Sequence, residues 1–326
     1  MKNQRLFIAS LALATLSTFN SRLSTAFAQG SLTPPGPPGP TMVTLQQIEP
    51  RTPIATTNFI IRQSGSYYLT TNLTVTGGDA IDILANGVTL DLNGFTISST
   101  SQSPSGNGIS LALMNGNTNI TIVNGHIAGG VTGGRFFGVS FTGPGFINGL
   151  LASGTPSNIR VSGVSVSGCL GDGINLGAGQ SMFVESCTVS TVGGTGIVGD
   201  SVSHSTAYNC GVDGIDATNA SDCSGNCINN GTGLDVVCTA NNCMGLSGGL
   251  MGIGLSAATA NNCYGLASPG GAGGTGLVAG CAINCYATEG LDFGNADDGY
   301  AIIATIANSC MIVFGAVSIV NKYNMP

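Results

Sequence analysis

A short motif that ends in cysteine recurs through the second half of the chain, and it constrains the fold more than any other feature. It reads TAYNC at 206–210, TANNC at 239–243 and 259–263, and IANSC at 306–310. A repeat of about 20 residues is typical of a solenoid, in which each repeat buries its apolar face only against its neighbours. The sequence therefore predicts one column of stacked cysteines. When looser copies of the motif are included, the members of this predicted column are Cys169, Cys187, Cys210, Cys227, Cys243, Cys263, Cys285 and Cys310.

A second column, of glycine followed by a large apolar residue, runs in step with the first. Asp or Thr mostly stands two residues before the apolar residue, as at Asp213. Such a residue suits a turn because its side chain can bond nearby backbone, and the glycine permits positive φ. Each repeat is thus predicted to be a turn, a short strand, a bend, a second short strand and a variable loop. The apolar members are Ile174, Ile197, Ile215, Leu234, Leu255, Leu277 and Tyr300.

Composition supports an ordered chain built from strands. Among 326 residues, 52 are glycine and only 7% are charged, and the mean hydropathy is +0.34. Disordered chains are poor in apolar residues and rich in charge, so disorder of the whole chain is excluded. Few amphipathic patterns of helix length occur, which favours an all-β repeat protein with a long, thin core.

The first residues have the pattern of an export signal. Lys2 and Arg5 precede an apolar stretch, and Ala26-Phe27-Ala28 is typical of a cleavage site. We therefore expect a signal peptide at 1–28, cleaved after Ala28, and a protein that is secreted, extracellular or held at the cell surface.

The rest of the chain divides into two segments. Residues 31–40 read SLTPPGPPGP, which is typical of a stiff spacer. We expect a proline-rich linker and N-terminal cap at 29–58, followed by the solenoid domain at 59–326.

Charge and hydropathy limit the partners. Loss of Lys2, Arg5 and Arg22 with the signal would leave 5 basic and 15 acidic residues, a net charge of −10. A nucleic-acid partner requires a basic surface, so none is expected, and anionic membranes are disfavoured for the same reason. Residues 301–320 are uncharged and long enough to span a bilayer. Because Cys310 continues the repeat there, we interpret this stretch as a rung and expect no membrane span after signal removal.

The 11 cysteines are interpreted mainly as core residues. Free cysteine behaves as a small buried hydrophobe, which suits a stacked column. Export permits disulfides, and rungs about 4.8 Å apart lie within the range of a bridge, so the pairing stays open. The pairs Cys223/Cys227 and Cys281/Cys285 lack the further ligands of a zinc site, and no metal site is predicted from cysteine.

Three further segments carry a family resemblance. VTLDLNG at 88–94, NITIVNG at 119–125 and NIRVSG at 158–163 each alternate apolar and polar residues up to a bend. With the later rungs, the chain from about 60 to 326 resembles the right-handed parallel β-helix repeat (pectin-lyase-like) superfamily, in its secreted bacterial form. The resemblance implies an all-β, single-stranded right-handed parallel β-helix of about 12 rungs of about 20 residues.

The catalytic patterns of that superfamily do not carry over. Its uronate-cleaving members use a basic residue and commonly Ca²⁺, but no Arg-x-Pro-x-x-Arg run occurs here. Arg135 and Arg160, in the middle of the coil, stand far from acidic clusters in the sequence. The hydrolase pattern Gly-His-Gly is reduced to Gly125-His126-Ile127, and Arg-Ile-Lys is absent. No catalytic residue is assigned on this basis.

One group of acids remains as a candidate ligand-binding site. If Ile215 and Leu234 point inward, Asp216 and Asp235 point outward on adjacent rungs, about 5 Å apart, with Asp213 nearby. Such a pair could share a proton, bind Ca²⁺ or act as a retaining glycosidase pair. Alternatively, these acids are solvated surface residues. Ca²⁺ is the one cofactor left open.

The sequence therefore predicts a secreted or surface β-helix protein that contacts polysaccharide or has a structural role without catalysis. Two alternatives stay open: a divergent polysaccharide lyase or glycoside hydrolase, and a passive adhesive rod. The sequence defines neither the ligand nor the oligomeric state.

Overall fold

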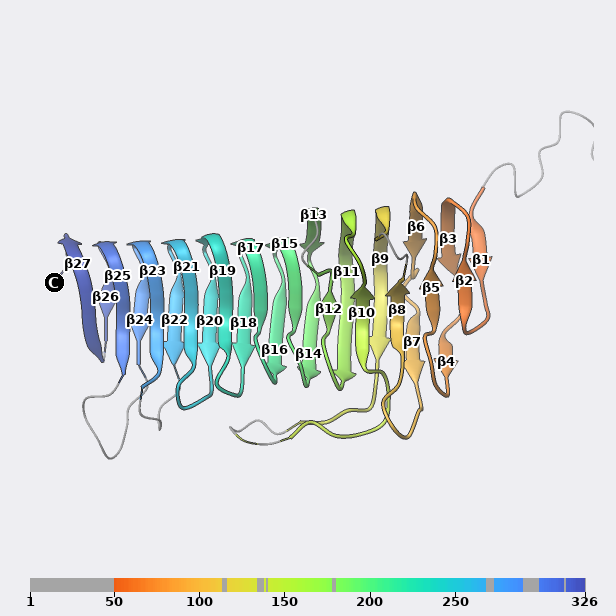
Figure 1. The fold of residues 1–326 in the computed structure, drawn as a ribbon, viewed down its shortest axis with the longest axis horizontal. Helices are drawn as coiled ribbons and strands as arrows, with labels where there is room; N and C mark the ends of the chain where they lie inside the picture. The colour runs from red at the N-terminus through yellow and green to blue at the C-terminus, as the bar shows by residue number, and fades with distance from the viewer. Residues whose placement is uncertain are drawn as a thin grey trace, which may run out of the picture. The chain divides into compact units, whose positions relative to one another are not determined.

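The computed structural model describes residues 50–112, 116–133, 138, 140–177, 180–267, 273–289, 299–313 and 315–325. The predicted signal peptide and residues 29–49 of the predicted linker and cap lie outside these residues. The chain divides into the units Met1–Pro50 and Arg51–Pro326, and the second unit contains every strand of the described residues. These strands form one continuous parallel sheet wound into a coil (Figure 1).

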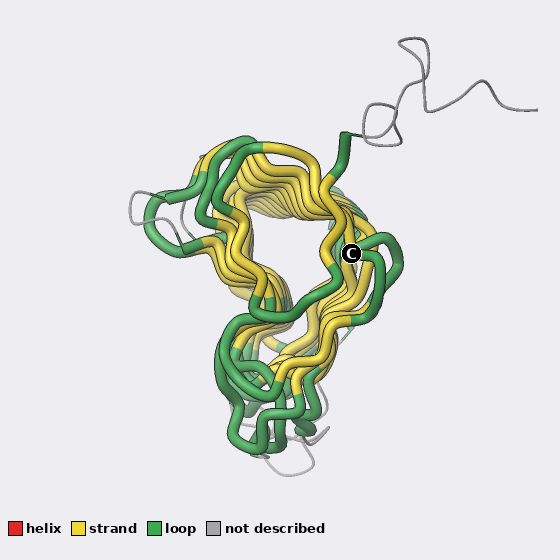
Figure 2. The backbone as a smooth tube through the Cα atoms, turned by 90° about the vertical axis from the view of Figure 1, so that its right-hand side faces the viewer, coloured by secondary structure: helices red, strands yellow, loops and turns green. Residues whose placement is uncertain are grey.

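Viewed along its long axis, the coil has three walls of strands (Figure 2). Each wall is a column of parallel strands, and each strand pairs with its counterparts one rung before and one rung after. The first column contains β2 (Phe59–Ile61), β5 (Ile81–Ile83), β8 (Asn107–Leu111), β10 (Asn148–Ala152), β12 (Ile174–Asn175) and the first halves of β15 (Ile197–Ser203), β17 (Ile215–Ser221), β19 (Thr232–Asn241), β21 (Ile253–Asn261), β23 (Thr275–Ile283), β25 (Tyr300–Asn308) and β27 (Ala316–Tyr323).

The other two columns complete each turn of the coil. The second column contains β1 (Thr52–Ile54), β3 (Gly65–Leu69), β6 (Val88–Asp91), the first halves of β9 (Thr118–Ala128) and β11 (Ser157–Cys169), β13 (Gln180–Glu185), and the second halves of β15, β17, β19, β21, β23, β25 and β27. The third contains β4 (Leu73–Val75), β7 (Thr96–Ser99), the second halves of β9 and β11, β14 (Thr188–Val192), β16 (Thr206–Cys210), β18 (Ser224–Cys227), β20 (Met244–Ser247), β22 (Tyr264–Ala267), β24 (Tyr286–Thr288) and β26 (Met311–Ile312).

This arrangement confirms the predicted parallel β-helix. The first column holds twelve strands, in agreement with the expected number of about 12 rungs. Sheet pairing already begins at Thr52, which is partnered with Tyr67 and lies inside the segment expected to be linker and cap. Residues 301–320 contribute to β25, β26 and β27 as a rung, and the described part of the chain has no helix with the length and apolarity of a membrane span.

The inward file of the first column forms the spine of the core. Its large apolar residues face one another rung by rung and are fully buried. Tyr300 was predicted to belong to this file, and that prediction is wrong. Tyr300 pairs with Thr275 and is 40% exposed, while Ile302 takes the place opposite Leu277. Ala301 there stands where earlier rungs have glycine, so the Gly-apolar pattern is displaced by two residues. The file is Ile81, Ile109, Leu150, Ile174, Ile197, Ile215, Leu234, Leu255, Leu277 and Ile302.

The glycines before these residues serve close packing and do not use the positive φ that glycine permits. Gly214, Gly233 and Gly254 are absent from the positive-φ residues of the described chain. A Cβ on Gly233 would overlap the backbone nitrogen of Leu246, and one on Gly254 would overlap that of Leu266. Glycine is therefore required where the first column approaches the backbone of the third.

The cysteines form two columns, so the prediction of one column is wrong. At the corner between the second and third columns stand Cys187, Cys223, Cys243, Cys263, Cys285 and Cys310, with Ser205 between the first two. Cys169, Cys210 and Cys227 lie instead at the end of the third column, where Cys210 is in register with Cys227. TAYNC therefore belongs to β16 in the third column and not to the TANNC corner. A spacing of about one repeat between two cysteines does not show whether they lie at the same corner of successive turns or at different corners.

The TANNC motif itself encodes the corner. From residues 186–187 to 309–310, two residues connect the second column to the third. The first of the two adopts positive φ, as at Asp222, Asn242, Asn262 and Asn284, a conformation that Asn and Asp tolerate better than most residues. The connection from the third column back to the first is variable: residues 211–214 in one rung and 129–147 in another.

Candidate functional site

The predicted acids lie together on the outer face of the first column. Asp216 of β17 is in direct register with Asp235 of β19, its neighbour in the coil (Figure 1). Ile215 and Leu234 are fully buried, so strand alternation turns the two aspartates outward. Asp216 is exposed and Asp235 is half-buried. The predicted orientation and register of this pair are confirmed, whereas a ligand-binding role stays a prediction.

Asp213 has a structural contact that the sequence did not indicate. Its Oδ1 accepts the backbone N–H of Thr232 on the next rung at 2.6 Å. Asp172 makes the equivalent contact with the N–H of Thr195 at 2.8 Å. The aspartate of the Asp-Gly-Ile motif therefore joins one rung to the next, and only part of its carboxylate remains available for a ligand.

The three carboxylates influence one another. Burial raises the pKa of Asp216, and the charges of Asp235 and Asp213 raise it further. Burial also raises the pKa of Asp213, against the opposing effect of the bond from Thr232, while the charge of Asp235 adds to the rise. None of the ion pairs in the described chain involves these residues. The group can therefore accept hydrogen bonds from hydroxyls, and Asp216 approaches protonation more readily than an isolated carboxylate.

An open depression of about 240 Å³ lies beside Asp216. Asp200 contributes a second carboxylate, one oxygen of which accepts the N–H of Met182 at 3.1 Å. Pockets that enclose a small ligand usually measure about 300–1,000 Å³, so the depression suits contact with part of a larger molecule. Its lining is Gly177, Val198, Gly199, Asp200, Asp216, Ala217, Thr218 and Val237.

A second acidic pair was missed by the sequence reasoning. Asp79 and Asp82 are both half-buried near the start of the coil. Burial, a hydrogen bond to Asp79 and the charge of Asp79 raise the pKa of Asp82 to about 6. The sequence contains a pattern that could have indicated this pair, because DAID at 79–82 has the same spacing of aspartates as DGID at 213–216.

The described residues around the acids offer few side-chain ligands for a metal ion. No three His, Cys, Asp or Glu side chains gather there in a way that could hold a metal ion. A Ca²⁺ ion at Asp216 and Asp235 would therefore depend on backbone and water for most of the six to eight oxygens it usually takes.

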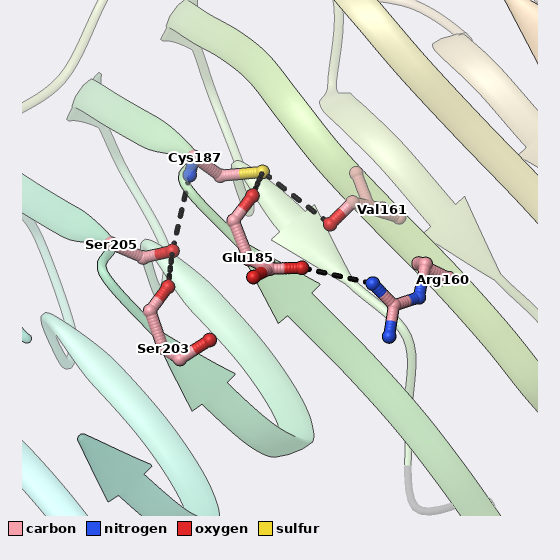
Figure 3. Close-up of polar contacts among 6 residues, drawn as sticks. All are labelled: Arg160, Val161, Glu185, Cys187, Ser203 and Ser205. Carbon is pink, nitrogen blue, oxygen red and sulfur yellow. Dashed lines mark hydrogen bonds and ion pairs between the residues drawn. The ribbon is translucent and has the colours of Figure 1, made fainter.

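Arg160, the candidate basic residue that the structure describes, lies on another wall of the coil than the acids. Arg135 lies outside the described residues. Arg160 belongs to the second column, where its guanidinium pairs with Glu185 at 2.9 Å (Figure 3). The guanidinium also lies 5.7 Å from the centre of the Phe183 ring. This grouping is an exposed structural contact on another wall of the coil.

The third column carries an aromatic surface that the sequence reasoning also missed. The rings of Tyr264 and Tyr286 lie 4.9 Å apart on adjacent rungs. Met244 and Met311 extend the same outward file at either side. The signal was the residue directly after the corner cysteine, which is Met or Tyr in four consecutive rungs.

Comparisons with known proteins give limited information. No family model matches the chain, and no curated protein matches it. A search of solved structures finds the A-module of mannuronan C-5 epimerase AlgE4 from Azotobacter vinelandii, at 11% identity and a TM-score of 0.34. The match covers 81% of this chain and 88% of the module. A likeness of this size carries no argument about what the chain binds or does.

Proposed function

We propose that the protein is a secreted or cell-surface β-helix protein that contacts an extended polysaccharide along its outer face without cleaving it. The observation that carries the proposal is the in-register pair Asp216–Asp235 beside an open depression. Outward residues repeat about every 4.8 Å along the coil, and a regular linear array suits a linear polymer better than a small molecule.

Charge narrows the class of polymer. The pair Asp216–Asp235, with Asp213 and Asp200 close by, gives this part of the surface negative charge. Like charges across an interface disfavour association. A neutral polysaccharide, whose hydroxyls donate to carboxylates, is therefore favoured over a uronic-acid polymer.

One observation favours the enzymatic alternative. Carboxylates about 5 Å apart, one of them with a raised pKa, are the pair that a retaining glycosidase uses. The pKa of Asp216 is raised, and Asp216 stands in register with Asp235 on the adjacent strand. The open depression counts against it, and we propose it only as the second candidate.

Binding is tested by affinity electrophoresis in gels that contain neutral or uronic-acid polysaccharides. We expect retardation in a neutral polymer and its loss when Asp216→Asn and Asp235→Asn are combined. The control is Asp222→Asn, a matched change at a corner where the next rungs already carry Asn242 and Asn262. Equal retardation of the control and the double variant would remove the acids from the binding site. A lack of retardation in any polymer would favour the passive rod.

Catalysis is tested on the same polymers, with Ca²⁺ and with a chelator. Reducing ends and the absorbance of unsaturated uronate are measured together. We expect no product from the wild-type protein. Product that disappears in Asp216→Asn would establish the enzymatic alternative, and product that requires Ca²⁺ would assign the cofactor.

A further inference from the structure

The corner between the second and third columns contains an unbroken row of thiols. Five consecutive rungs place a cysteine at the same position, and each is nearly fully buried: Cys223, Cys243, Cys263, Cys285 and Cys310. The strand residues on both sides of each cysteine are paired in register with the next rung, as Asn241 is with Asn261 and Met244 with Tyr264. Adjacent cysteines therefore face each other directly.

Backbone bonds lock this register at the corner itself. The N–H of Met244 donates to the carbonyl of Cys223 at 2.9 Å, and that of Tyr264 donates to the carbonyl of Cys243 at 2.8 Å. Neighbouring Cα atoms are thus about 4.8 Å apart, the spacing of adjacent strands, which lies within the range that a disulfide spans. All cysteines of the chain are free thiols in this structure.

The thiols of the row also contact one another. Cys243 is hydrogen-bonded to both Cys223 and Cys263, and these bonds lower its pKa. Cys285 is held in the same way between Cys263 and Cys310, with the same effect on its pKa. The thiolate is the species that attacks a disulfide, so each thiol of the row stands beside the group with which it can react.

We propose that, in an oxidising environment, this row forms two disulfides between adjacent rungs and retains one free thiol. Two bonds between neighbours can be placed in a row of five in only three ways. The free thiol is then Cys223, Cys263 or Cys310, while Cys243 and Cys285 are always bonded. The free thiol adjoins a bonded cysteine and can attack it. This exchange forms a new bond and releases a cysteine two positions along the row as the new free thiol.

The chemistry balances with a low-molecular-weight disulfide as the oxidant. Two cysteine thiols and one glutathione disulfide give one cystine bond and two glutathione thiols. The first thiolate displaces one glutathione and forms a mixed disulfide. The neighbouring thiolate then displaces the second glutathione, and the two protons leave with the released thiols.

Ser205 marks the end of the row. It occupies the corner position between Cys187 and Cys223, so Cys187 has no adjacent cysteine at the corner. Its Oγ donates to the carbonyl of Ser203 at 2.8 Å and accepts the N–H of Cys187 at 3.1 Å (Figure 3). The Sγ of Cys187 donates in the same way to the carbonyl of Glu185 at 3.3 Å. Serine therefore fits this corner, and Cys→Ser variants of the row should fold.

The test uses the full chain, folded in a buffer with reduced and oxidised glutathione. The sample is quenched in acid, free thiols are alkylated, and peptides are mapped by mass spectrometry. Pepsin is the suitable protease, because it preserves the bonds at low pH and the chain has no Lys or Arg between Arg160 and Lys322. In the wild-type protein, we expect Cys243 and Cys285 to be bonded to row neighbours in every molecule.

Two variants with the same substitution distinguish the proposal from general oxidation. Cys263→Ser divides the row into two pairs and should give only the bonds Cys223–Cys243 and Cys285–Cys310. Cys243→Ser leaves Cys223 without an adjacent cysteine and should allow only one row bond, between Cys285 and either Cys263 or Cys310. Cys187→Ser is the control and should keep two bonds. Equal numbers of row bonds in Cys263→Ser and Cys243→Ser, free Cys243 in the oxidised wild type, or no row bonds at all would overturn the proposal.

Discussion

Asp213 Oδ1 and the backbone nitrogen of Thr232 are joined across adjacent rungs by a 2.6 Å hydrogen bond. The bond comes from the corner that precedes the first column, and Asp172 repeats it with Thr195. Asp213, a candidate ligand contact, therefore also holds adjacent rungs of the coil together.

Asp213→Ala should lower the free energy of unfolding by about 1–3 kcal/mol, because the N–H of Thr232 loses its partner in a half-buried site. Asp213→Asn keeps an oxygen acceptor and should cost less. The exposed Asp216→Ala serves as the control, with an expected change within about 0.5 kcal/mol. Urea denaturation measures all three. Equal losses in Asp213→Ala and Asp216→Ala would contradict the stacking role.

Gly233→Ala should destabilise the coil strongly, by about 3 kcal/mol or more, since the added methyl meets the backbone of β20 and β21 and two rungs must separate. Gly199→Ala is the matched control, because its added methyl would lie no closer than 3.4 Å to any neighbour. Thermal unfolding of both variants compares them directly. Similar midpoints would show that the first and third columns approach less closely than described.

The pKa of Asp82 predicts a specific dependence of stability on pH. Burial, followed by the hydrogen bond and charge of Asp79, raises it from 3.8 to about 6 in the folded protein. Between these values the folded state binds more protons than the unfolded state, so stability falls as pH rises through this window. Below about pH 3.8 the contribution of the protonated group is fully present.

Asp82→Asn should flatten this part of the profile and raise the unfolding midpoint at pH 7. The comparison is a series of midpoints from pH 3.5 to 7.5 for the wild type and Asp82→Asn. A profile for Asp82→Asn parallel to that of the wild type would assign the dependence to other groups.

The ion pair of Arg160 with Glu185 should contribute little to stability. Both side chains are well exposed, at 51% and 41%, and exposed pairs are usually worth less than about 1 kcal/mol. A double-mutant cycle with Arg160→Ala and Glu185→Ala should give a coupling energy of about 0.5 kcal/mol that decreases with salt. A coupling energy above about 2 kcal/mol at high salt would indicate that the contact is shielded from solvent.

The fold was predictable because alternation and repeat length constrain it together. Apolar residues alternate with polar ones at 88–92 and again at 95–97 after the bend at Asn93-Gly94. With the recurrence of Gly-Ile or Gly-Leu, this alternation leaves a parallel coil as the way to bury them. The register of Asp216 with Asp235 followed from the same pattern, because each aspartate comes directly after an inward residue. Only one rung failed, where Tyr300 follows a glycine that is out of place.

The corners were harder to predict, for physical reasons. The cysteines occupy two corners of one turn, and similar volumes at both corners suit the same residue type, so the sequence alone does not separate Cys210 from Cys243. The role of Gly233 depends on backbone from β20 and β21, which no local pattern reveals. The Asp79–Asp82 pair could have been found by comparing DAID with DGID, but the raised pKa of Asp82 depends on its burial in β5 and on its contact with Asp79.

The unequal corners of the coil have a consequence for how such a chain can diversify. From residues 186–187 onward, the corner between the second and third columns keeps two residues, the first of them at positive φ, whereas the return to the first column ranges from residues 211–214 to residues 129–147. An insertion at the return corner leaves the register of the three columns intact, because the next rung still begins at its own glycine and apolar residue. Insertions and substitutions can therefore accumulate along the return corner while the three columns keep their spacing. New side chains at that edge need not disturb the stacked core.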